Sequence, residues 1–190
     1  MEQKLTENKM FKKKDFREIP LQKGTYELCK FINCDFSEVS LSLINFIDCE
    51  FMNCNLSQAR FGDTVLRDIT FKDCKMLGLH FENCAGFGLS FSFENCILDH
   101  SSFYKRKINK TVFKDSKLHE TDFTECDLTG SVFDNCDLAR TIFINSILEK
   151  TDFRTSYNYS IDPEINKIKK AKFSKDGLAG LLTKYDIKIE

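Results

Sequence analysis

Large apolar residues recur at every fifth position along most of this chain, and this period constrains the fold more than any other feature. From Phe31 to Phe81 every fifth residue is large and apolar, and the pattern runs again in a second frame from Phe93 to Phe153. An α-helix repeats every 3.6 residues and a strand every two, so neither explains the pattern. A period of five suits a short straight step followed by a corner, repeated in coils that stack at roughly the 4.8 Å strand spacing. The centre residues expected to form the core columns are Phe31, Phe36, Phe51, Leu56, Phe71, Phe81, Phe103, Phe113, Leu118, Phe123, Leu128, Phe133, Leu138, Phe143 and Phe153.

The position two residues before each centre holds small side chains. All nine cysteines of the chain fall in this one slot, and its other occupants are mostly Ser, Thr, Ala or Val. The cysteine spacing is explained by the repeat and contains no Cys-x-x-Cys pair, so it does not indicate a metal site. We expect free, buried thiols that pack as small hydrophobes, with no metal and no cofactor.

The repeat resembles that of the pentapeptide-repeat proteins, whose motif is a small residue, Asp or Asn, Leu or Phe, and two polar residues. Two of the matches are Cys34-Asp35-Phe36-Ser37-Glu38 and Thr121-Asp122-Phe123-Thr124-Glu125, and the resemblance covers about residues 11–156. It implies an all-β solenoid, a right-handed quadrilateral parallel β-helix with four pentapeptides in each coil. About seven coils would then form a rod of roughly 34 Å at the strand spacing.

The breaks in the repeat divide the chain. We expect a flexible N-terminus over residues 1–10, the β-helix over 11–156 with a frame shift at 85–92, and a C-terminal cap or dimerisation segment over 157–190. The frame shift contains Gly86-Phe87-Gly88, which favours either a bend in the chain or a protruding functional loop. Arg106 occupies an inward slot, and because an unpaired charge should not enter an apolar core we expect a local bulge there.

The C-terminal segment has the pattern of a short α-helix. Leu178, Leu181, Leu182 and Tyr185 recur at helical spacing, and Ser174 is a suitable N-cap. The tail resembles the ending of the Qnr and MfpA quinolone-resistance proteins, in which two C-terminal ends pack together in a homodimer. That resemblance implies that these four residues form a dimer interface; the alternative is a cap on a monomer.

Charge and composition argue against several classes of function. The formal net charge is −1, which gives no reason to expect direct binding of nucleic acid. There is neither an export signal nor a long apolar span, so we expect a cytoplasmic protein without membrane contact. The three histidines have no nucleophile–base–acid pattern around them, and no glycine-rich loop has phosphate-binding chemistry. We therefore expect no catalytic residues, no enzyme activity and no small-molecule substrate.

The resemblance to Qnr implies a partner, DNA gyrase or topoisomerase IV, and a mechanism of partial DNA mimicry that changes quinolone sensitivity. Residues 118–139 hold six acidic residues and no Lys or Arg, which makes them the expected acidic partner face. These residues are Glu120, Asp122, Glu125, Asp127, Asp134 and Asp137. The alternative function is a general protein–protein interaction scaffold.

Overall fold

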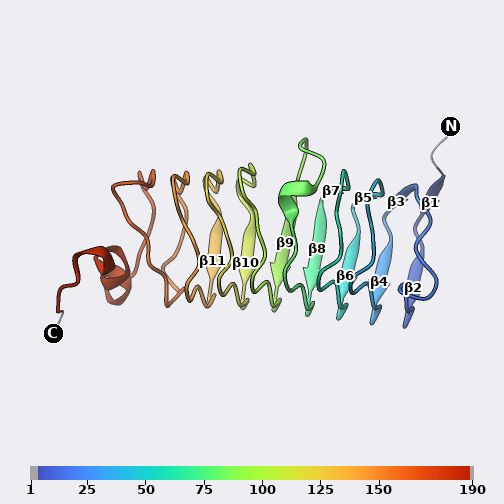
Figure 1. Cartoon of the computed structure of the whole chain (residues 1–190), viewed down its shortest axis with the longest axis horizontal. Helices are drawn as coiled ribbons and strands as arrows, with labels where there is room; N and C mark the ends of the chain where they lie inside the picture. The colour runs from blue at the N-terminus through green and yellow to red at the C-terminus, as the bar shows by residue number, and fades with distance from the viewer. Residues whose placement is uncertain (1–3, 189–190) are drawn as a thin grey trace.

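Short parallel strands form the walls of the rod that the computed structural model shows for residues 4–188, with the two ends of the chain far apart (Figure 1). Each strand is three or four residues long, as a five-residue step requires. The strands are β1 (Leu5–Glu7), β2 (Met10–Lys12), β3 (Thr25–Glu27), β4 (Lys30–Ile32), β5 (Asn45–Ile47), β6 (Glu50–Met52), β7 (Val65–Arg67), β8 (Ile69–Lys72), β9 (Phe91–Glu94), β10 (Val112–Lys114) and β11 (Val132–Asp134). Between residues 4 and 188 the only helical segments are short 3-10 turns, η1 (Phe81–Asn83), η2 (Asp176–Leu181) and η3 (Thr183–Tyr185).

The strands pair in parallel with a register of 20 residues, so that Phe31 of β4 faces Phe51 of β6. Twenty residues are four pentapeptides, which gives each coil four sides. The four faces are numbered 1 to 4 in the order in which the chain follows them around a coil, starting with the face of β2. Face 1 carries the seven-stranded sheet β2-β4-β6-β8-β9-β10-β11, and face 4 carries the four-stranded sheet β1-β3-β5-β7. On faces 2 and 3 isolated parallel bridges join each coil to the next, such as Asp35↔Asn55 on face 2 and Asp122↔Ile142 on face 3. The chain is thus an all-β parallel solenoid, while the right-handed sense and the count of seven coils stay predictions.

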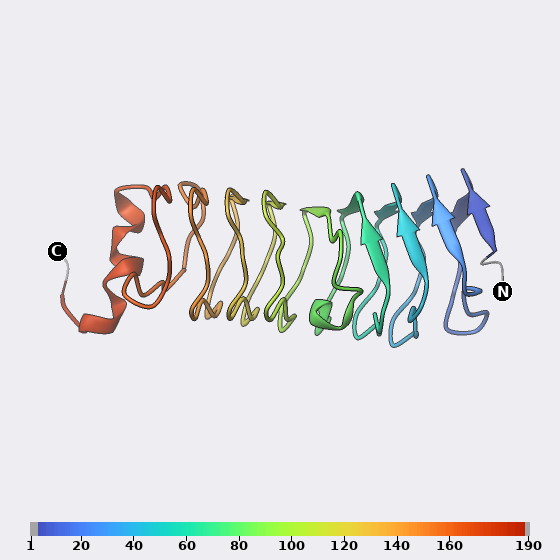
Figure 2. The same cartoon turned by 90° about the horizontal axis from the view of Figure 1, so that it is seen from above.

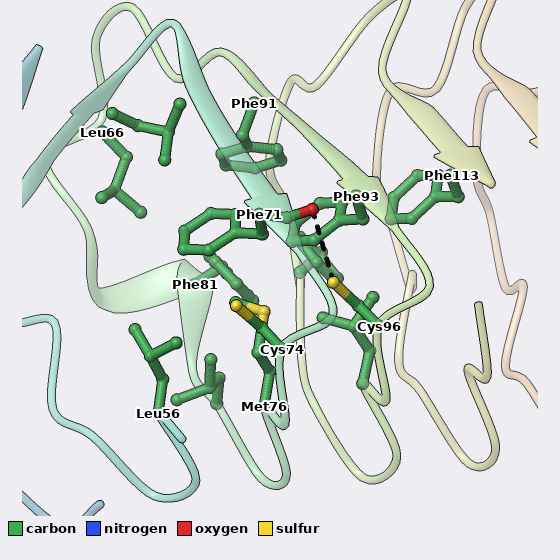
Figure 3. Packing of buried hydrophobic residues seen from close by; sticks show 14 of the residues in the cluster. Leu56, Leu66, Phe71, Cys74, Met76, Phe81, Phe91, Phe93, Cys96 and Phe113 are labelled. Atoms are coloured by element: carbon green, nitrogen blue, oxygen red, sulfur yellow. Dashed lines mark hydrogen bonds between the residues drawn. The ribbon is translucent and has the colours of Figure 1, made fainter. Parts of the chain in front are cut away.

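Columns of stacked phenylalanine rings fill the inside of the rod. Every centre residue predicted to form the core is at most 4% exposed. On face 1 the rings of Phe71, Phe93 and Phe113 stack nearly parallel, with centroids 5.3 and 5.1 Å apart (Figure 3). Rings from the opposite faces 1 and 3 meet edge to face, as Phe113 and Phe123 do at 5.9 Å and 81°. Aromatic pairs in these two geometries contribute about 0.5–1.5 kcal/mol each beyond the area they bury.

Many side chains of the small slot also donate a hydrogen bond to the neighbouring coil. Cys54 Sγ lies 3.3 Å from the carbonyl oxygen of Phe31, and the hydroxyls of Thr121 and Ser146 donate to equivalent carbonyls at 3.1 and 2.8 Å. In each case the acceptor lies 23 residues earlier, in the coil below. Cys, Thr and Ser therefore exchange at this slot because each is small and can donate to the neighbouring coil.

The last residue of each pentapeptide turns the corner in a left-handed backbone conformation. Asn, Asp and Gly tolerate positive φ best, and the corner after face 1 is occupied by Asn or Asp over much of its length. The amides form a ladder there: Asn95 Nδ2 donates to Asp73 Oδ1 and Asn135 Nδ2 to Asp115 Oδ1, both at 2.7 Å. These outward polar residues therefore both set the turn and join consecutive coils.

The frame shift adds two residues to one coil. β8 pairs with β9 at a register of 22, so Phe71 still faces Phe93. The extra chain leaves the wall after Ala85 and returns at Ser90, forming a loop that projects from the rod (Figure 1). Phe87 at its tip is 94% exposed, and Gly88 adopts a φ of +75°. Of the two interpretations of Gly86-Phe87-Gly88, the geometry is that of a protruding loop.

The predicted bulge at Arg106 is wrong. Arg106 N–H donates to Phe103 O at 3.0 Å, and Asp127 N–H donates to Arg106 O at 2.8 Å, so the coil is regular. The Arg106 guanidinium instead lies against Gly86, with Nη1 3.4 Å from where a β-carbon on that glycine would stand. The absence of a side chain at Gly86 leaves the space that a larger residue would fill, and the backbone therefore has no need to move.

Both ends of the rod differ from expectation. Residues 5–7 form β1, which pairs with β3, so the solenoid begins before the predicted boundary at residue 11. At the other end bridges such as Ile147↔Lys167 extend the coils beyond residue 156. The predicted C-terminal α-helix is wrong, because residues 176–185 form 3-10 turns (Figure 2). Gly177 and Gly180 weaken an α-helix and lie so close to Tyr159 that a β-carbon at either would collide with it.

Phe123→Ala tests the stacked core. The Phe123 ring lies 5.0 Å from Phe103 and 5.4 Å from Phe143, so its removal opens a cavity in a continuous column. We expect a loss of about 3–5 kcal/mol in the free energy of unfolding, measured by denaturant titration. Ile144→Ala, at a position 42% exposed, is the control and should change stability by less than about 0.5 kcal/mol. Similar stability for the two variants would contradict the assigned frame.

Candidate functional site

The histidines pair with carboxylates rather than with nucleophiles. His80 Nδ1 lies 2.7 Å from Glu82, His100 Nδ1 lies 3.1 Å from Glu120, and His119 lies between Asp99 at 3.3 Å and Asp137 at 3.0 Å. Within residues 4–188 no group of three or more His, Cys, Asp or Glu side chains could hold a metal ion. The contacts of His100 and His119 tie adjacent coils together, whereas His80 and Glu82 belong to the same coil.

The nine cysteines are free thiols in the core, each at most 3% exposed. Burial raises the pKa of the Cys49 and Cys136 thiols to about 12, which keeps them protonated and unreactive at neutral pH. Cys74 and Cys96 are neighbours in one column, and Cys96 Sγ lies 3.5 Å from Phe71 O (Figure 3). The thiols therefore serve the packing and hydrogen bonding of the small slot.

The six acidic residues predicted to form a partner face surround the rod. Asp134 lies in β11 on face 1, while the bridges place Asp137 on face 2, Asp122 on face 3 and Asp127 on face 4. Glu120 and Glu125 occupy the left-handed corners on either side of face 3. The structure thus brings Glu120, Asp122 and Glu125 to one side of the rod and Asp134 to another.

Most of these carboxylates have local partners. Glu120 forms an ion pair with Arg140 at 2.6 Å, and that hydrogen-bonded pair lowers the pKa of Glu120. Burial opposes ionisation of Asp137, but hydrogen bonds from Asn158 and His119 outweigh it and lower its pKa. Asp122 Oδ1 accepts the backbone N–H of Thr124 at 2.8 Å. These residues are partly committed to holding turns and joining coils.

The C-terminal residues predicted to form an interface divide into two kinds. Leu181 is partly buried against the core, whereas Leu178, Leu182 and Tyr185 are 48%, 36% and 50% exposed at the end of the rod. The Ser174 hydroxyl accepts the N–H of Gly177 at 3.0 Å, but the N-cap position of η2 is occupied by Lys175 and not by Ser174 as predicted. The segment therefore caps the last coil through Leu181 and leaves three apolar side chains facing outward.

Ion pairs hold this C-terminal segment on the rod. Lys184 Nζ lies 2.9 Å from Asp162 and 2.6 Å from Glu164, and Tyr185 donates its hydroxyl to Glu164 at 2.8 Å. The Glu164 hydrogen bond raises the pKa of Lys184, with Asp162 adding to the effect. The exposed leucines are thus presented on an anchored segment.

A cleft of about 950 Å³ opens on face 3 near the projecting loop. Arg60, His80, Glu82 and Arg106 line it, and Gly62 contributes to its width because it has no side chain. Glu82 Oε2 and Arg106 Nε are buried and have no hydrogen-bond partner among residues 4–188. The loop and this cleft form a surface feature that the regular repeat does not explain; in the sequence its only signs were the frame shift and the misplaced arginine.

The repeat pattern itself identifies the family. The pentapeptide repeat region matches residues 24–92 and 89–158, which together span most of the chain. This chain belongs to the pentapeptide-repeat family. No curated protein sequence is significantly similar to it.

Solved structures of QnrB1 share the architecture. A trypsin-treated variant of QnrB1, a plasmid-mediated fluoroquinolone resistance protein, superposes with a TM-score of 0.63 at 17% identity, covering 98% of this chain and all (100%) of that one. Full-length QnrB1 gives a TM-score of 0.55 at 17% identity, with 97% of this chain and 100% of that chain covered. HetL, a pentapeptide repeat protein involved in heterocyst differentiation regulation in the cyanobacterium Nostoc, gives 0.40 at 12% identity, covering 93% and 92%. At these identities the QnrB1 likeness establishes the fold.

In the part of the chain that the structure covers, residues 4–188, no helix has the length and apolar character needed to cross a bilayer.

The buried thiols give a direct chemical test. Native protein should react with a thiol reagent such as DTNB far more slowly than unfolded protein, because every thiol is buried in the core. After unfolding without reductant all nine cysteines should titrate. Fewer than nine would indicate disulfides, and a fast-reacting thiol in the native protein would contradict the core packing described here.

Proposed function

We propose that this protein is a non-catalytic, Qnr-like binder of a type II topoisomerase, DNA gyrase or topoisomerase IV, that modulates quinolone sensitivity. The observation that carries the proposal is the similarity to QnrB1 along nearly the whole of both chains. A fold by itself does not specify a function, so the proposal also depends on the surfaces of this rod.

The proposed mechanism is partial DNA mimicry by a right-handed quadrilateral rod of about seven coils. Duplex DNA carries one negative charge per roughly 1.7 Å, so a rod of ~34 Å would need about twenty to match it. The net charge here is −1, and Glu120, Asp122 and Glu125 gather on one corner and face, where Arg140 pairs with Glu120 and Lys105 with Glu125. The mimicry we propose is therefore one of shape, with charge matching confined to that side.

We further propose a homodimer joined through the C-terminal segment, located in the cytoplasm. Leu178 and Leu182 face outward from a segment that ion pairs hold to the last coil, which suits an isologous contact between two rod ends. Free buried thiols are compatible with the reducing cytoplasm.

The alternative is a general protein-interaction scaffold. The exposed Phe87 supports it, because an aromatic side chain on a projecting loop beside a polar cleft is a suitable anchor for a partner. Ile142 and Ile144 add apolar surface on face 3, at 40% and 42% exposure. A pulldown that returns one dominant partner other than a topoisomerase subunit would favour this function.

A supercoiling assay tests the topoisomerase proposal. Purified protein should either relieve ciprofloxacin inhibition of gyrase or inhibit supercoiling itself at low micromolar concentration. Glu120→Gln/Asp122→Asn/Glu125→Gln should weaken the effect if the acidic side of face 3 meets the enzyme. Asp15→Asn/Glu18→Gln/Asp35→Asn, which removes the same charge elsewhere, is the control. Absence of any effect on both topoisomerases would contradict the proposal.

Leu178→Asp/Leu182→Asp tests the dimer. Because both side chains are exposed, the variant should remain folded and change from dimer to monomer in light scattering. Ile142→Asp/Ile144→Asp places the same charges on a wall of the rod and should keep the dimer mass. A monomeric native protein, or a dimer unaffected by the leucine changes, would rule out this interface.

A further inference from the structure

The net charge of −1 conceals a strong separation of charge along face 4. Before the projecting loop the outward residues of this face include Glu27, Asp48 and Asp68 with one base, Arg67. After the loop the same face becomes rich in lysine. We call this part the lysine face; its members are Lys107, Lys110, Lys150, Lys167, Lys169 and Lys170.

Backbone pairing brings these lysines together although they span 64 positions of the sequence, from 107 to 170. The bridges Lys107↔Asp127, Asp127↔Ile147 and Ile147↔Lys167 stack four coils on this face. At its corner Lys110 N–H donates to Thr129 O and Lys150 N–H donates to Lys169 O, both at 3.0 Å. The lysines therefore form a band that extends along the rod.

The band carries uncompensated charge. All six lysines are exposed, and none lies within 4.0 Å of a carboxylate among residues 4–188. Two acidic residues share the face, Asp127 and Glu149. The Asp127 carboxylate already accepts hydrogen bonds from Thr129 and Asn109. Six positive against two negative charges leave an excess of four on this face.

Gly130 keeps the corner between Lys110 and Lys150 free of a side chain. A residue with a side chain there would stand between Lys110 and Lys150 in the corner column, but Gly130 has a φ of +71° and the Lys110 stem lies 3.6 Å from where its β-carbon would be. The corner therefore stays open, and the Lys110 and Lys150 side chains are not separated by a bulky neighbour.

We propose that the lysine face binds the phosphate backbone of duplex nucleic acid without sequence preference. Three coil steps span roughly 14 Å at the strand spacing, a length over which duplex DNA presents about eight negative charges. The band has the length of that stretch of duplex, and its six lysines would face about eight phosphates. Lysine acts as a point charge toward phosphate, whereas arginine has a planar guanidinium that matches a carboxylate. The only arginine beside this face is the half-buried Arg106.

Two further features favour duplex nucleic acid. Residues 107–110, 127–130, 147–150 and 167–170 contain no aromatic side chain on which unstacked bases could lie, as single-strand binding requires. The band is a straight row without a pocket, which fits backbone contact better than docking of an acidic protein side chain. The acidic side around face 3 and the lysine face point in different directions, so the protein could contact a topoisomerase and its DNA at once.

Fluorescence anisotropy with a labelled duplex of about 20 base pairs, titrated between about 50 and 200 mM salt, tests the proposal. The variant Lys110→Gln/Lys150→Gln/Lys170→Gln removes the corner column, and glutamine tolerates this backbone geometry because Gln58 has a φ of 57°. Each lost phosphate contact lowers the slope of log K against log salt by about 0.9, so the slope should fall by about 2–3. Affinity at the lower salt should fall at least tenfold.

The matched control is Lys9→Gln/Lys12→Gln/Lys13→Gln, three exposed lysines near the N-terminus that include a left-handed corner at Lys13. It has the same net charge as the test variant and should bind like the native protein. The variant Lys110→Arg/Lys150→Arg/Lys170→Arg should retain binding, which separates loss of charge from loss of fold. Thermal melting confirms that each variant is folded.

Several results would overturn the proposal. These are the absence of salt-dependent duplex binding, an equal loss in the test and control triples, and tighter binding of polyglutamate than of duplex, which would indicate an acidic protein partner. Equal affinity for a single strand of the same sequence would also overturn it, because the duplex would then not be the recognised form.

Discussion

The parallel ladder of hydrogen bonds between coils is the interaction on which the rest of this protein depends. Each coil returns to the same position after 20 residues, so identical side chains stack directly on one another. Phenylalanine can then form columns with centroids about 5 Å apart, because that spacing matches both strand separation and ring stacking. A residue that suits one coil suits the next, which is why a five-residue motif can build the whole rod.

The same ladder explains how the chain absorbs an irregularity. The coil with two extra residues leaves the wall as the four-residue loop Gly86–Leu89, and the 22-residue register restores the columns at once. The face-4 sheet ends at β7, since the loop departs from the wall where its next strand would be. Arg106, which does not fit the repeat motif, lies in the space beside Gly86. The irregular loop therefore accommodates the irregular side chain.

The stacking of coils also groups charged side chains differently from their order in the sequence. Residues 118–139 contain six acidic residues and no Lys or Arg, yet successive pentapeptides place these acidic residues on all four faces. Conversely, Lys107 and Lys167 are far apart in sequence and share one face. Net charge is therefore a poor guide to what a solenoid binds. The lysine face and the acidic side around face 3 would address different partners, nucleic acid and protein.

The sequence by itself determined the repeat, the core columns, the buried thiols and the position of the frame shift, because a five-residue period leaves each side chain only one role. It did not determine the 3-10 form of residues 176–185, which depends on the packing of Gly177 and Gly180 against Tyr159. Nor did it determine the regular backbone at Arg106. Only the tertiary structure decided which charges share a face, since that depends on the 20-residue register and on the two residues inserted into one coil.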